Sequence, residues 1–172
     1  EPLGKDDMWY CKQCKDHVQA MKKLDLWRMP PILVMHLKRF SYSRTWRDKI
    51  DTLVDFPLNT LDMMPYVLPN ASSGPAPIYD LYAVVNHFGG MGGGHYTAYT
   101  RHAEEGAWHL YDDSHCTAVD VSAALNNSAA YVLFYKRRDV PMRQAMSRAG
   151  SLCNLTTVDV AVSKNTPSDN DE

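Results

Sequence analysis

The chain has 172 residues and a mass of 19.5 kDa, which suffices for one domain with its own hydrophobic core. Hydrophobic residues make up 45% of the sequence, charged residues 22%, and the formal net charge is −2. These values show that the chain as a whole is neither a disordered tail nor a basic nucleic-acid-binding arm, and no apolar run approaches the roughly eighteen residues of a membrane helix. We therefore expect neither nucleic acid nor a membrane as a partner.

The charge is distributed unevenly along the chain. Residues 1–50 carry 11 Lys/Arg against 6 Asp/Glu, whereas residues 51–172 carry 7 against 14, so the second part would attract a cationic partner. The first residue is Glu1 rather than Met and no signal peptide pattern follows it, which predicts a piece of a longer protein. Four cysteines are too few for a disulfide framework, which predicts an intracellular protein in the cytoplasm, the nucleus or both.

The first strong strand signal follows a double proline. Pro30 and Pro31 precede a run of β-prone residues, so a strand is predicted to begin at about Ile32, apolar on both faces as in the centre of a sheet. Residues 69–77 consist of loop formers, and a second strand is predicted directly after them, over residues 79–87.

The second half of the chain predicts more strands and little helix. Residues 95–101 and 107–113 are predicted to form a hairpin, and a short helix near Ser122–Leu125 precedes a last strand over 129–138. We therefore predict an α+β domain over residues 1–138, strand-rich and mostly antiparallel. Residues 139–172 are rich in Ser, Asn, Thr and Asp and are predicted to be a mostly disordered tail.

Large aromatic side chains and glycines are given different expectations. Four aromatic residues are predicted to lie in the core rather than at a ligand: Trp27, Phe40, Phe56 and Tyr131. Five of the nine glycines fall within residues 89–94, directly before His95. This glycine segment leads into a strand rather than a helix, which argues against a phosphate-binding loop and leaves a flexible hairpin loop or a slot for a thin substrate.

The predicted hairpin can bring His95 and Asp112 together. Opposite residues of an antiparallel pair have a constant number sum, and a sum of 207 places these two residues face to face. A sum of 209 makes them diagonal neighbours on one face, about 7–8 Å apart at Cα, whereas an even sum separates them onto opposite faces. The register therefore allows the pair without requiring it.

A carboxylate behind an imidazole points to base catalysis. It fixes the tautomer and leaves the other ring nitrogen to accept a proton from a nucleophile, although a purely structural hydrogen bond is the simpler alternative. Ser114 and Cys116 lie close by in sequence, but neither has the context of an activated nucleophile.

The two N-terminal cysteines have the spacing of a zinc knuckle. Cys11 and Cys14 form a C-x-x-C pair, which supplies two of the four ligands that tetrahedral zinc needs, and His17 is a candidate third ligand. An accidental pair of free thiols explains the spacing equally well.

Six blocks of the sequence resemble the C-terminal half of the catalytic domain of ubiquitin-specific proteases, papain-like cysteine proteases, and in particular their plant and large multidomain animal members. The blocks stand in the family's order and cover about residues 8–138: Cys11-x-x-Cys14, 22–40, 51–57, 79–101, 108–114 and 129–137.

The resemblance implies a function and a set of site residues. It implies hydrolysis of the isopeptide or peptide bond after the C-terminal Gly of ubiquitin, with ubiquitin and ubiquitinated proteins as partners. It implies His95 as the general base, Asp112 as the residue that orients it and Asp113 as an assisting acid. The residues implied to contact the ubiquitin tail, beneath a blocking loop at 89–94, are Gly89, Gly90, Gly92, Gly93, Gly94 and Tyr96.

The resemblance also implies a palm with part of the fingers, in which Cys11 and Cys14 are half of a zinc ribbon. The family's nucleophilic Cys block, its oxyanion residue and its first zinc knuckle do not occur in these 172 residues. We therefore expect a fragment that lacks the thumb and does not hydrolyse ubiquitin conjugates by itself, because a base and an acid only activate an attack that needs the sulfur.

Two other functions remain open, and cofactors follow from the same comparison. The chain could be an inactive, truncated ubiquitin-binding module, or a zinc-dependent structural module built on Cys11, Cys14 and His17. No cofactor is expected for catalysis, and structural zinc is expected only if the upstream knuckle is present. The face that the thumb would cover is expected to be unusually apolar.

Overall fold

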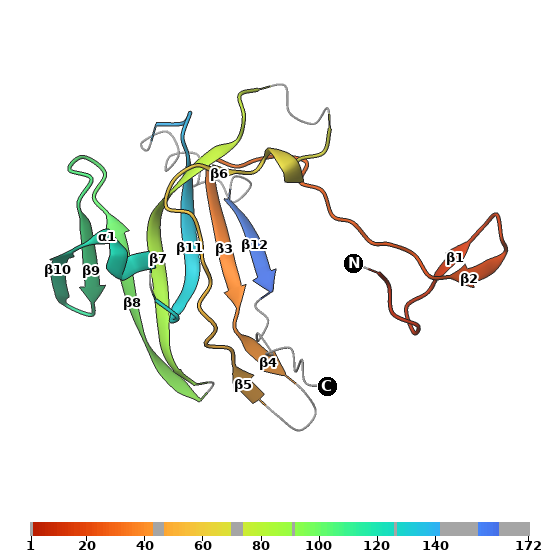
Figure 1. Ribbon diagram of the computed structural model, residues 1–172, viewed down its shortest axis with the longest axis horizontal. Coiled ribbons are helices and arrows are strands. Elements are labelled where there is room, and N and C mark those ends of the chain that lie inside the picture. The colour runs from red at the N-terminus through yellow and green to blue at the C-terminus, as the bar shows by residue number, and fades with distance from the viewer. Residues whose placement is uncertain are drawn as a thin grey trace, which may run out of the picture. The chain divides into compact units, whose positions relative to one another are not determined.

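The computed structural model describes residues 2–42, 47–69, 74–90, 92–125, 127–141 and 155–161. The chain divides into two compact units, of which the smaller comprises Glu1–Arg28 and Tyr66–Ser73. In this unit β1 (Trp9–Cys11) and β2 (Asp16–Val18) form a two-stranded antiparallel sheet (Figure 1).

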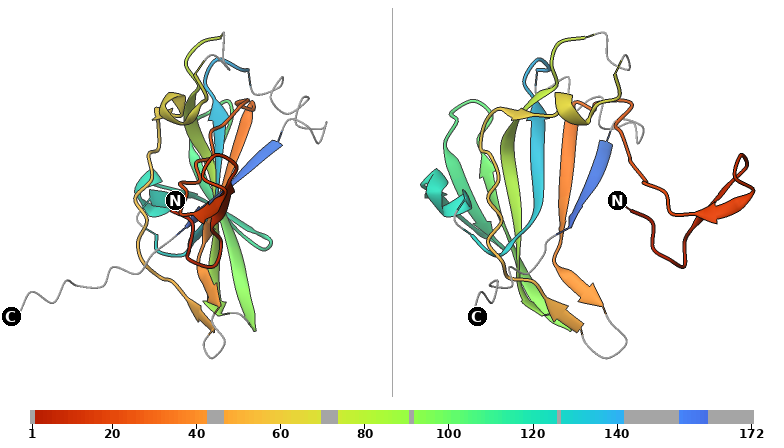
Figure 2. Two further views of the ribbon diagram at one scale, coloured as in Figure 1. Left: turned by 90° about the vertical axis from the view of Figure 1, so that its right-hand side faces the viewer. Right: turned by 45° about the vertical axis from the view of Figure 1, so that its right-hand side comes forward.

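The larger unit, Met29–Pro65 and Gly74–Glu172, is built on an eight-stranded sheet. Its strands run in the order β10-β9-β8-β7-β11-β3-β12, with β6 paired to β7, and the views of Figure 2 show them as one layer. The bounds are β3 Ile32–Lys38, β6 Leu61–Asp62, β7 Ile78–Gly90, β8 Gly93–Arg101, β9 Trp108–Asp112, β10 His115–Val119, β11 Ala130–Arg137 and β12 Leu155–Ala161. All pairings in this sheet are antiparallel except that of β12 with β3.

Short elements complete the described part of the chain. The strands β4 (Phe40–Tyr42) and β5 (Arg47–Lys49) form a second antiparallel pair, α1 spans Val121–Leu125, and a 3-10 helix spans Met64–Tyr66. No helix in the described residues is long and apolar enough to cross a membrane. The predicted strand-rich, mostly antiparallel α+β class is confirmed.

The core lies along β3, β7 and β11. Leu33, Leu81 and Leu133 are at most 1% exposed, which confirms the prediction that the run after the double proline is a central strand. Two buried tyrosines satisfy their hydroxyls on the main chain, since Tyr79 donates to Pro30 O and Tyr135 to Pro57 O. Burial raises the pKa of both hydroxyls well above the usual range, so they remain neutral donors.

The expectation for one core residue, Trp27, needs correction, and part of the predicted tail forms a strand. Trp27 is 69% exposed, whereas Phe56 is buried as predicted. Trp27 belongs to the smaller unit, where the described sheet has only two strands, and it is not part of the core along β3, β7 and β11. Within the tail that is expected to be mostly disordered, Leu155–Ala161 form β12 and pair with β3, and the expectation for the tail as a whole stays a prediction. The domain boundary at residue 138 stays a prediction.

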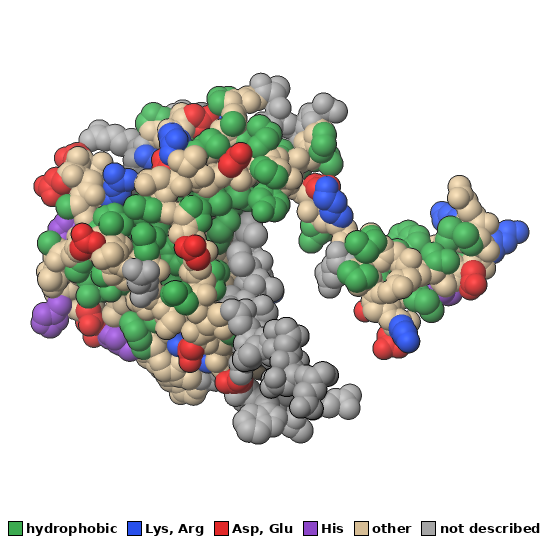
Figure 3. Space-filling model, in the orientation of Figure 1, with side chains coloured by type: hydrophobic (Ala, Val, Ile, Leu, Met, Phe, Trp, Pro, Cys, Tyr) green, Lys and Arg blue, Asp and Glu red, His purple; other side chains and the backbone are tan. Residues whose placement is uncertain are grey.

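The predicted apolar face can be compared with the surface of the larger unit. Figure 3 shows hydrophobic side chains spread over the face of this unit that is turned to the viewer. The exposed large hydrophobic residues of the unit include Phe88 of β7 and Tyr96 of β8, at 42% and 55% exposure. Both lie near the glycine-rich end of this strand pair. Whether this surface exceeds that of ordinary proteins stays a prediction.

Candidate active site

His95 and Asp112 lie on neighbouring strands in one of the two registers that bring them together. The pairing of Ala98 with Tyr111 and of Arg101 with Trp108 sets the number sum of β8 and β9 at 209. His95 and Asp112 are therefore diagonal neighbours on one face of the sheet. His95 Nε2 donates a hydrogen bond to Asp112 Oδ1 at 2.5 Å.

This hydrogen bond determines what the imidazole can do. Because Asp112 engages Nε2, the nitrogen that can exchange a proton with a substrate or nucleophile is Nδ1. The hydrogen bond to Asp112 is the largest cause of a raised pKa at His95, and the charges of Asp112 and Asp113 act in the same direction. The side chains of His95 and Asp112 are 47% and 48% exposed, so a substrate can reach the pair.

Asp113 joins the pair from the turn between β9 and β10. It is the first of the two residues between Asp112 and its partner His115, and its φ of 47° is one that Asp tolerates better than most residues. One ring nitrogen of His95 and one carboxylate oxygen each of Asp112 and Asp113 all lie within 4.8 Å of one another. The structure thus brings together the three residues for which the sequence suggested acid–base roles.

The raised pKa of His95 leads to a testable pH dependence. Asp112→Asn removes the charge, so we expect the pKa of His95 to fall in the variant. A raised folded-state pKa also means that the contact stabilises the fold below the unfolded-state pKa, and that this contribution is lost as pH rises through the folded-state pKa. An NMR titration of the His95 ring measures the shift.

Asp120→Asn is the matched control for this titration. Asp120 accepts a hydrogen bond from Ser122 N at the start of α1, so its charge should leave the pKa of His95 unchanged. An equal effect of the two variants, or no fall in D112N, would contradict the role of Asp112.

Four of the five glycines, Gly89, Gly90, Gly93 and Gly94, form the paired ends of two strands, and Gly92 lies in the turn between them. Gly89 pairs with Gly94 and Gly90 with Gly93, so the ladder of β7 and β8 continues to the tip of the hairpin, and the role of residues 89–94 as a blocking loop stays a prediction. A Cβ on Gly94 would overlap His87 Nε2 and lie 2.5 Å from Phe88 O, and Gly89 has a φ of 95°. An added Cβ at Gly90, Gly92 or Gly93 would meet nothing within 4 Å. Of the five glycines in this segment, only Gly89 and Gly94 occupy positions that would not accept a larger residue without a shift of the structure.

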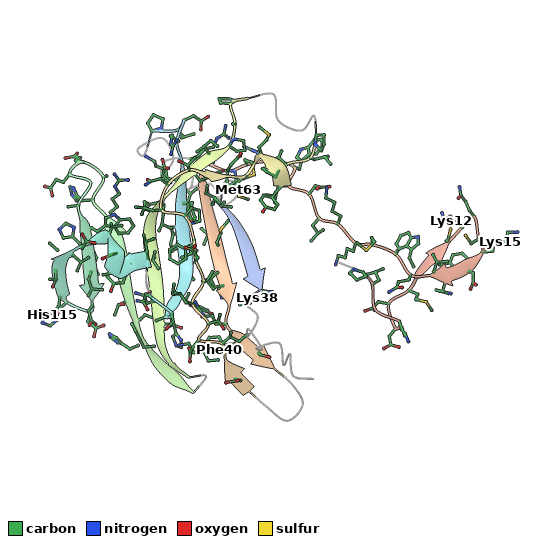
Figure 4. All side chains as sticks on the ribbon, viewed as in Figure 1. Lys12, Lys15, Lys38, Phe40, Met63 and His115 are labelled. Carbon is green, nitrogen blue, oxygen red and sulfur yellow. The ribbon has the colours of Figure 1, made fainter. Side chains whose placement is uncertain are left out.

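A cleft of about 380 Å³ lies at this end of the sheet. Its lining comprises Phe40, His87, Gly90, Gly93, Gly94, Tyr96 and Tyr131. The ring of His87 is 4.7 Å from that of Tyr96, 5.5 Å from that of Phe40 and 5.8 Å from that of Tyr131, measured between ring centroids. Figure 4 labels Phe40, at the start of β4. The four tail-binding candidates Gly90, Gly93, Gly94 and Tyr96 thus share one cleft.

Three members of this cleft were missed by sequence reasoning. Phe40 and Tyr131 were expected in the core, but they are only half-buried and line the cleft, while His87 is 4% exposed. Burial is the largest cause of a lowered pKa at His87, which favours the neutral ring, and its buried Nδ1 has no hydrogen-bond partner among the described residues. The only local signal was alternation, which places His87 opposite Tyr96 once the register is known.

The nearby cysteine does not share the face of the dyad. His115 pairs with Asp112 and Cys116 with Tyr111. Because opposite residues share a face and successive residues alternate, Cys116 lies on the face opposite to Asp112 and His95. Cys116 is therefore not the partner of His95, which agrees with its lack of an activating sequence context, and Cys153 lies outside the described residues.

The zinc-knuckle residues lie in the hairpin of the smaller unit. Cys11 ends β1, Lys15 N donates to its carbonyl, and Lys15 has a φ of 56°. Hydrogen bonds from Cys14, chiefly that of its backbone, lower the pKa of the Cys11 thiol, which favours the thiolate that binds zinc. His17 pairs with Tyr10 and packs against its ring, on the face opposite to Cys11, so the suggestion of His17 as third ligand is not supported.

Comparison with known proteins places this geometry in a family. The family model described as ubiquitin carboxyl-terminal hydrolase matches residues 6–135. The chain belongs to this family. It is 57% identical over 137 residues to ubiquitin carboxyl-terminal hydrolase 10 of Arabidopsis thaliana, and 56% identical over 139 residues to human ubiquitin carboxyl-terminal hydrolase 15. These alignments cover 80% and 81% of the chain but only 14% of the length of each relative.

Solved structures share the fold. The structure of the yeast SAGA DUBm is similar with a TM-score of 0.69 and 33% identity, over 81% of this chain and 30% of that chain. A SAGA DUB module of Ubp8, Sgf11, Sus1 and Sgf73 bound to ubiquitin aldehyde is similar with a TM-score of 0.68 and 32% identity, over 81% of this chain and 31% of that chain. The hydrolase family thus identified agrees with the resemblance carried by the six sequence blocks.

Proposed function

We propose that this chain carries the general base and the tail-binding cleft of a deubiquitinating thiol hydrolase. The observation that carries the proposal is the hydrogen bond between His95 of β8 and Asp112 of β9. The residue after His95, Tyr96, lines the cleft at the glycine-rich end of the same strand. Membership of the ubiquitin carboxyl-terminal hydrolase family supports it. Similar solved structures bound to monoubiquitin or ubiquitin aldehyde support ubiquitin as the ligand.

The reaction uses a cysteine from outside this chain as the nucleophile. Nδ1 of His95 takes the thiol proton, and the thiolate attacks the carbonyl carbon of the C-terminal Gly of ubiquitin. The resulting imidazolium is stabilised by Asp112 and gives its proton to the leaving amine, which frees the lysine or N-terminus and leaves a thioester. Water, deprotonated by His95, then hydrolyses the thioester and releases ubiquitin.

The cleft suits a thin, extended tail. Because His95 and Tyr96 point to opposite faces of β8, a chain lying against Tyr96 must pass the glycine end of the hairpin to bring a carbonyl to His95. Gly90 and Gly93 leave open space at that end, and backbone can approach closely where side chains are absent. The Gly-Gly end of ubiquitin, joined to ubiquitinated proteins, has this shape.

For the smaller unit, we propose a zinc site to which this chain contributes two of the four ligands. Cys11 and Cys14 fit one half of a structural zinc site, and two further ligands would complete it. In the complete protein we expect that Cys11→Ser lowers the zinc content by about one ion per chain, because three ligands hold structural zinc poorly. Metal analysis of this variant measures the loss, with Cys116→Ser as the control, and unchanged zinc in C11S would contradict the site.

The activity itself is tested with the complete protein and with this chain. Ubiquitin carrying a fluorogenic amide at its C-terminus should be cleaved by the complete protein, whereas this chain alone should bind ubiquitin in a calorimetric titration without cleaving it. Saturable binding without cleavage by the complete protein would favour a non-catalytic ubiquitin-binding module. The proposal is wrong if neither cleavage nor binding is found.

A further inference from the structure

Arg39 is a fully buried cation that is held by main-chain carbonyl groups. It lies between β3 and β4 and is 0% exposed. Its Nε donates to Ala130 O at 2.5 Å, and its Nη1 donates to Ile50 O at 2.8 Å and to Thr52 O at 2.9 Å. Among the described residues, its buried Nη2 has no hydrogen-bond partner.

These hydrogen bonds tie together the segments that carry the aromatic wall of the cleft, which we define as Phe40, His87 and Tyr131. Arg39 directly precedes Phe40, and its acceptor Ala130 directly precedes Tyr131. The residue before Ala130 is bonded to the third member, because His87 N donates to Ala129 O at 2.9 Å. Phe40 is therefore next to Arg39 in sequence, Tyr131 is next to its acceptor Ala130, and His87 is hydrogen-bonded to the residue before that acceptor.

A second cation secures the same wall from β5. Lys49 Nζ donates to His87 O at 2.7 Å, and Ile50 N donates to Arg39 O at 2.7 Å. Residues 49–52 are therefore hydrogen-bonded both to Arg39, which precedes Phe40, and to His87, so they link these two members of the wall.

Burying the guanidinium of Arg39 costs folding free energy, so a contribution to stability does not by itself explain this residue. Desolvation is the largest cause of a lowered pKa at Arg39, and the charge of Asp51 offsets it only in part. No carboxylate is hydrogen-bonded to the guanidinium in the described part of the chain, and one of its nitrogens is unsatisfied. A guanidinium presents several donors in one rigid plane, so it can hold carbonyls of separate segments at a set spacing. An apolar side chain has no donors, and the compact, rotatable ammonium of a lysine does not fix that spacing.

We propose that Arg39 is a positioning residue that sets the spacing of the aromatic wall and thereby the affinity of the cleft for the ubiquitin tail. The inference rests on the proposed function for its ligand. Its structural part, the spacing of the wall, can be measured without any ligand. Arg39 acts through Ala130 O, Ile50 O and Thr52 O and does not itself line the cleft.

The test compares two variants of Arg39 with a control of similar stability loss. Arg39→Lys keeps the charge but not the fork, and Arg39→Gln keeps one donor group without the charge. Leu133→Ala opens a cavity at a 1% exposed core residue of β11 that does not line the cleft. All are measured under conditions in which thermal melts show them to be folded, by NOEs between the Phe40 and Tyr131 rings and by calorimetric titration with ubiquitin.

We expect both Arg39 variants to lose the ring NOEs and at least about tenfold in ubiquitin affinity, and L133A to keep the NOEs and stay within about twofold of the parent. The inference is overturned if the Arg39 variants keep the NOEs and the affinity, or if L133A loses both to the same degree. If the parent chain does not bind ubiquitin but the NOEs still depend on Arg39, the proposed ligand fails and the positioning role stands. If the parent binds and the Arg39 variants lose the NOEs but bind equally well, the proposed ligand stands and the effect of Arg39 on the affinity is overturned.

Discussion

His95→Ala in the complete protein is expected to lower the turnover of a ubiquitin C-terminal amide by about 10⁴-fold or more while leaving ubiquitin binding nearly unchanged. The loss is large because Nδ1 of His95 is the group that would deprotonate the thiol and later protonate the leaving amine. Binding is retained because the cleft is lined by other residues, on the opposite face of β8. Steady-state kinetics and a separate calorimetric titration measure the two effects.

His102→Ala is the matched control for this substitution. The side chain of His102 is 47% exposed, like that of His95, but its contact is with Glu105 in the turn after β8 rather than with Asp112. Turnover of H102A should stay within about twofold of the parent protein. Near-full activity of H95A would overturn the assignment of the base, and a loss of binding equal to the loss of turnover would show that His95 acts in binding instead.

Gly94→Ala is expected to destabilise the larger unit by about 1–3 kcal/mol and to abolish measurable binding of the ubiquitin tail. A Cβ at this position would overlap the buried imidazole of His87 and crowd Phe88 O. Neither can move freely, since His87 is 4% exposed and Phe88 is part of the β7 ladder. The wall of the cleft must therefore shift.

The control for this substitution is Gly93→Ala, one residue away. Its added Cβ would meet nothing within 4 Å, so we expect a change in the free energy of unfolding below about 1 kcal/mol. Because Gly93 lines the cleft, its methyl group should still weaken binding of the tail, so the free energy of unfolding is the readout that separates the two variants. Urea unfolding and titration with ubiquitin measure both variants. Equal effects of G93A and G94A on the free energy of unfolding would contradict the close packing of Gly94 on His87 and would favour a general need for flexible glycines at the tip.

The local sequence was sufficient to predict most strands. The double proline and the β-branched run after it predicted the start of β3 at Ile32, and the alternating pattern after residue 94 predicted β8. These predictions succeed because strand formation here depends on neighbouring residues and on burial of both faces. The short apolar tail strand β12 was missed, since its pairing depends on the free edge of β3, a segment more than one hundred residues away.

For the candidate site, the sequence supplied the residues and the structure supplied their arrangement. His95, Asp112 and Asp113 could be nominated from residue type, spacing and family resemblance, because a hairpin leaves only a few possible registers. Phe40, His87 and Tyr131 could not be recognised as one wall, because they come from three separate segments that meet only in the folded sheet.

Local motifs and strand patterns were enough to predict the family and the fold class and to nominate His95 and Asp112 as a pair. Only the tertiary structure decided the register of β8 and β9, the side of the sheet on which Cys116 lies and the tie between Arg39 and Ala130. The physical reason is that each of these depends on contacts between segments brought together by burial of the core. Local preferences limit such contacts to a few alternatives, and packing selects among them.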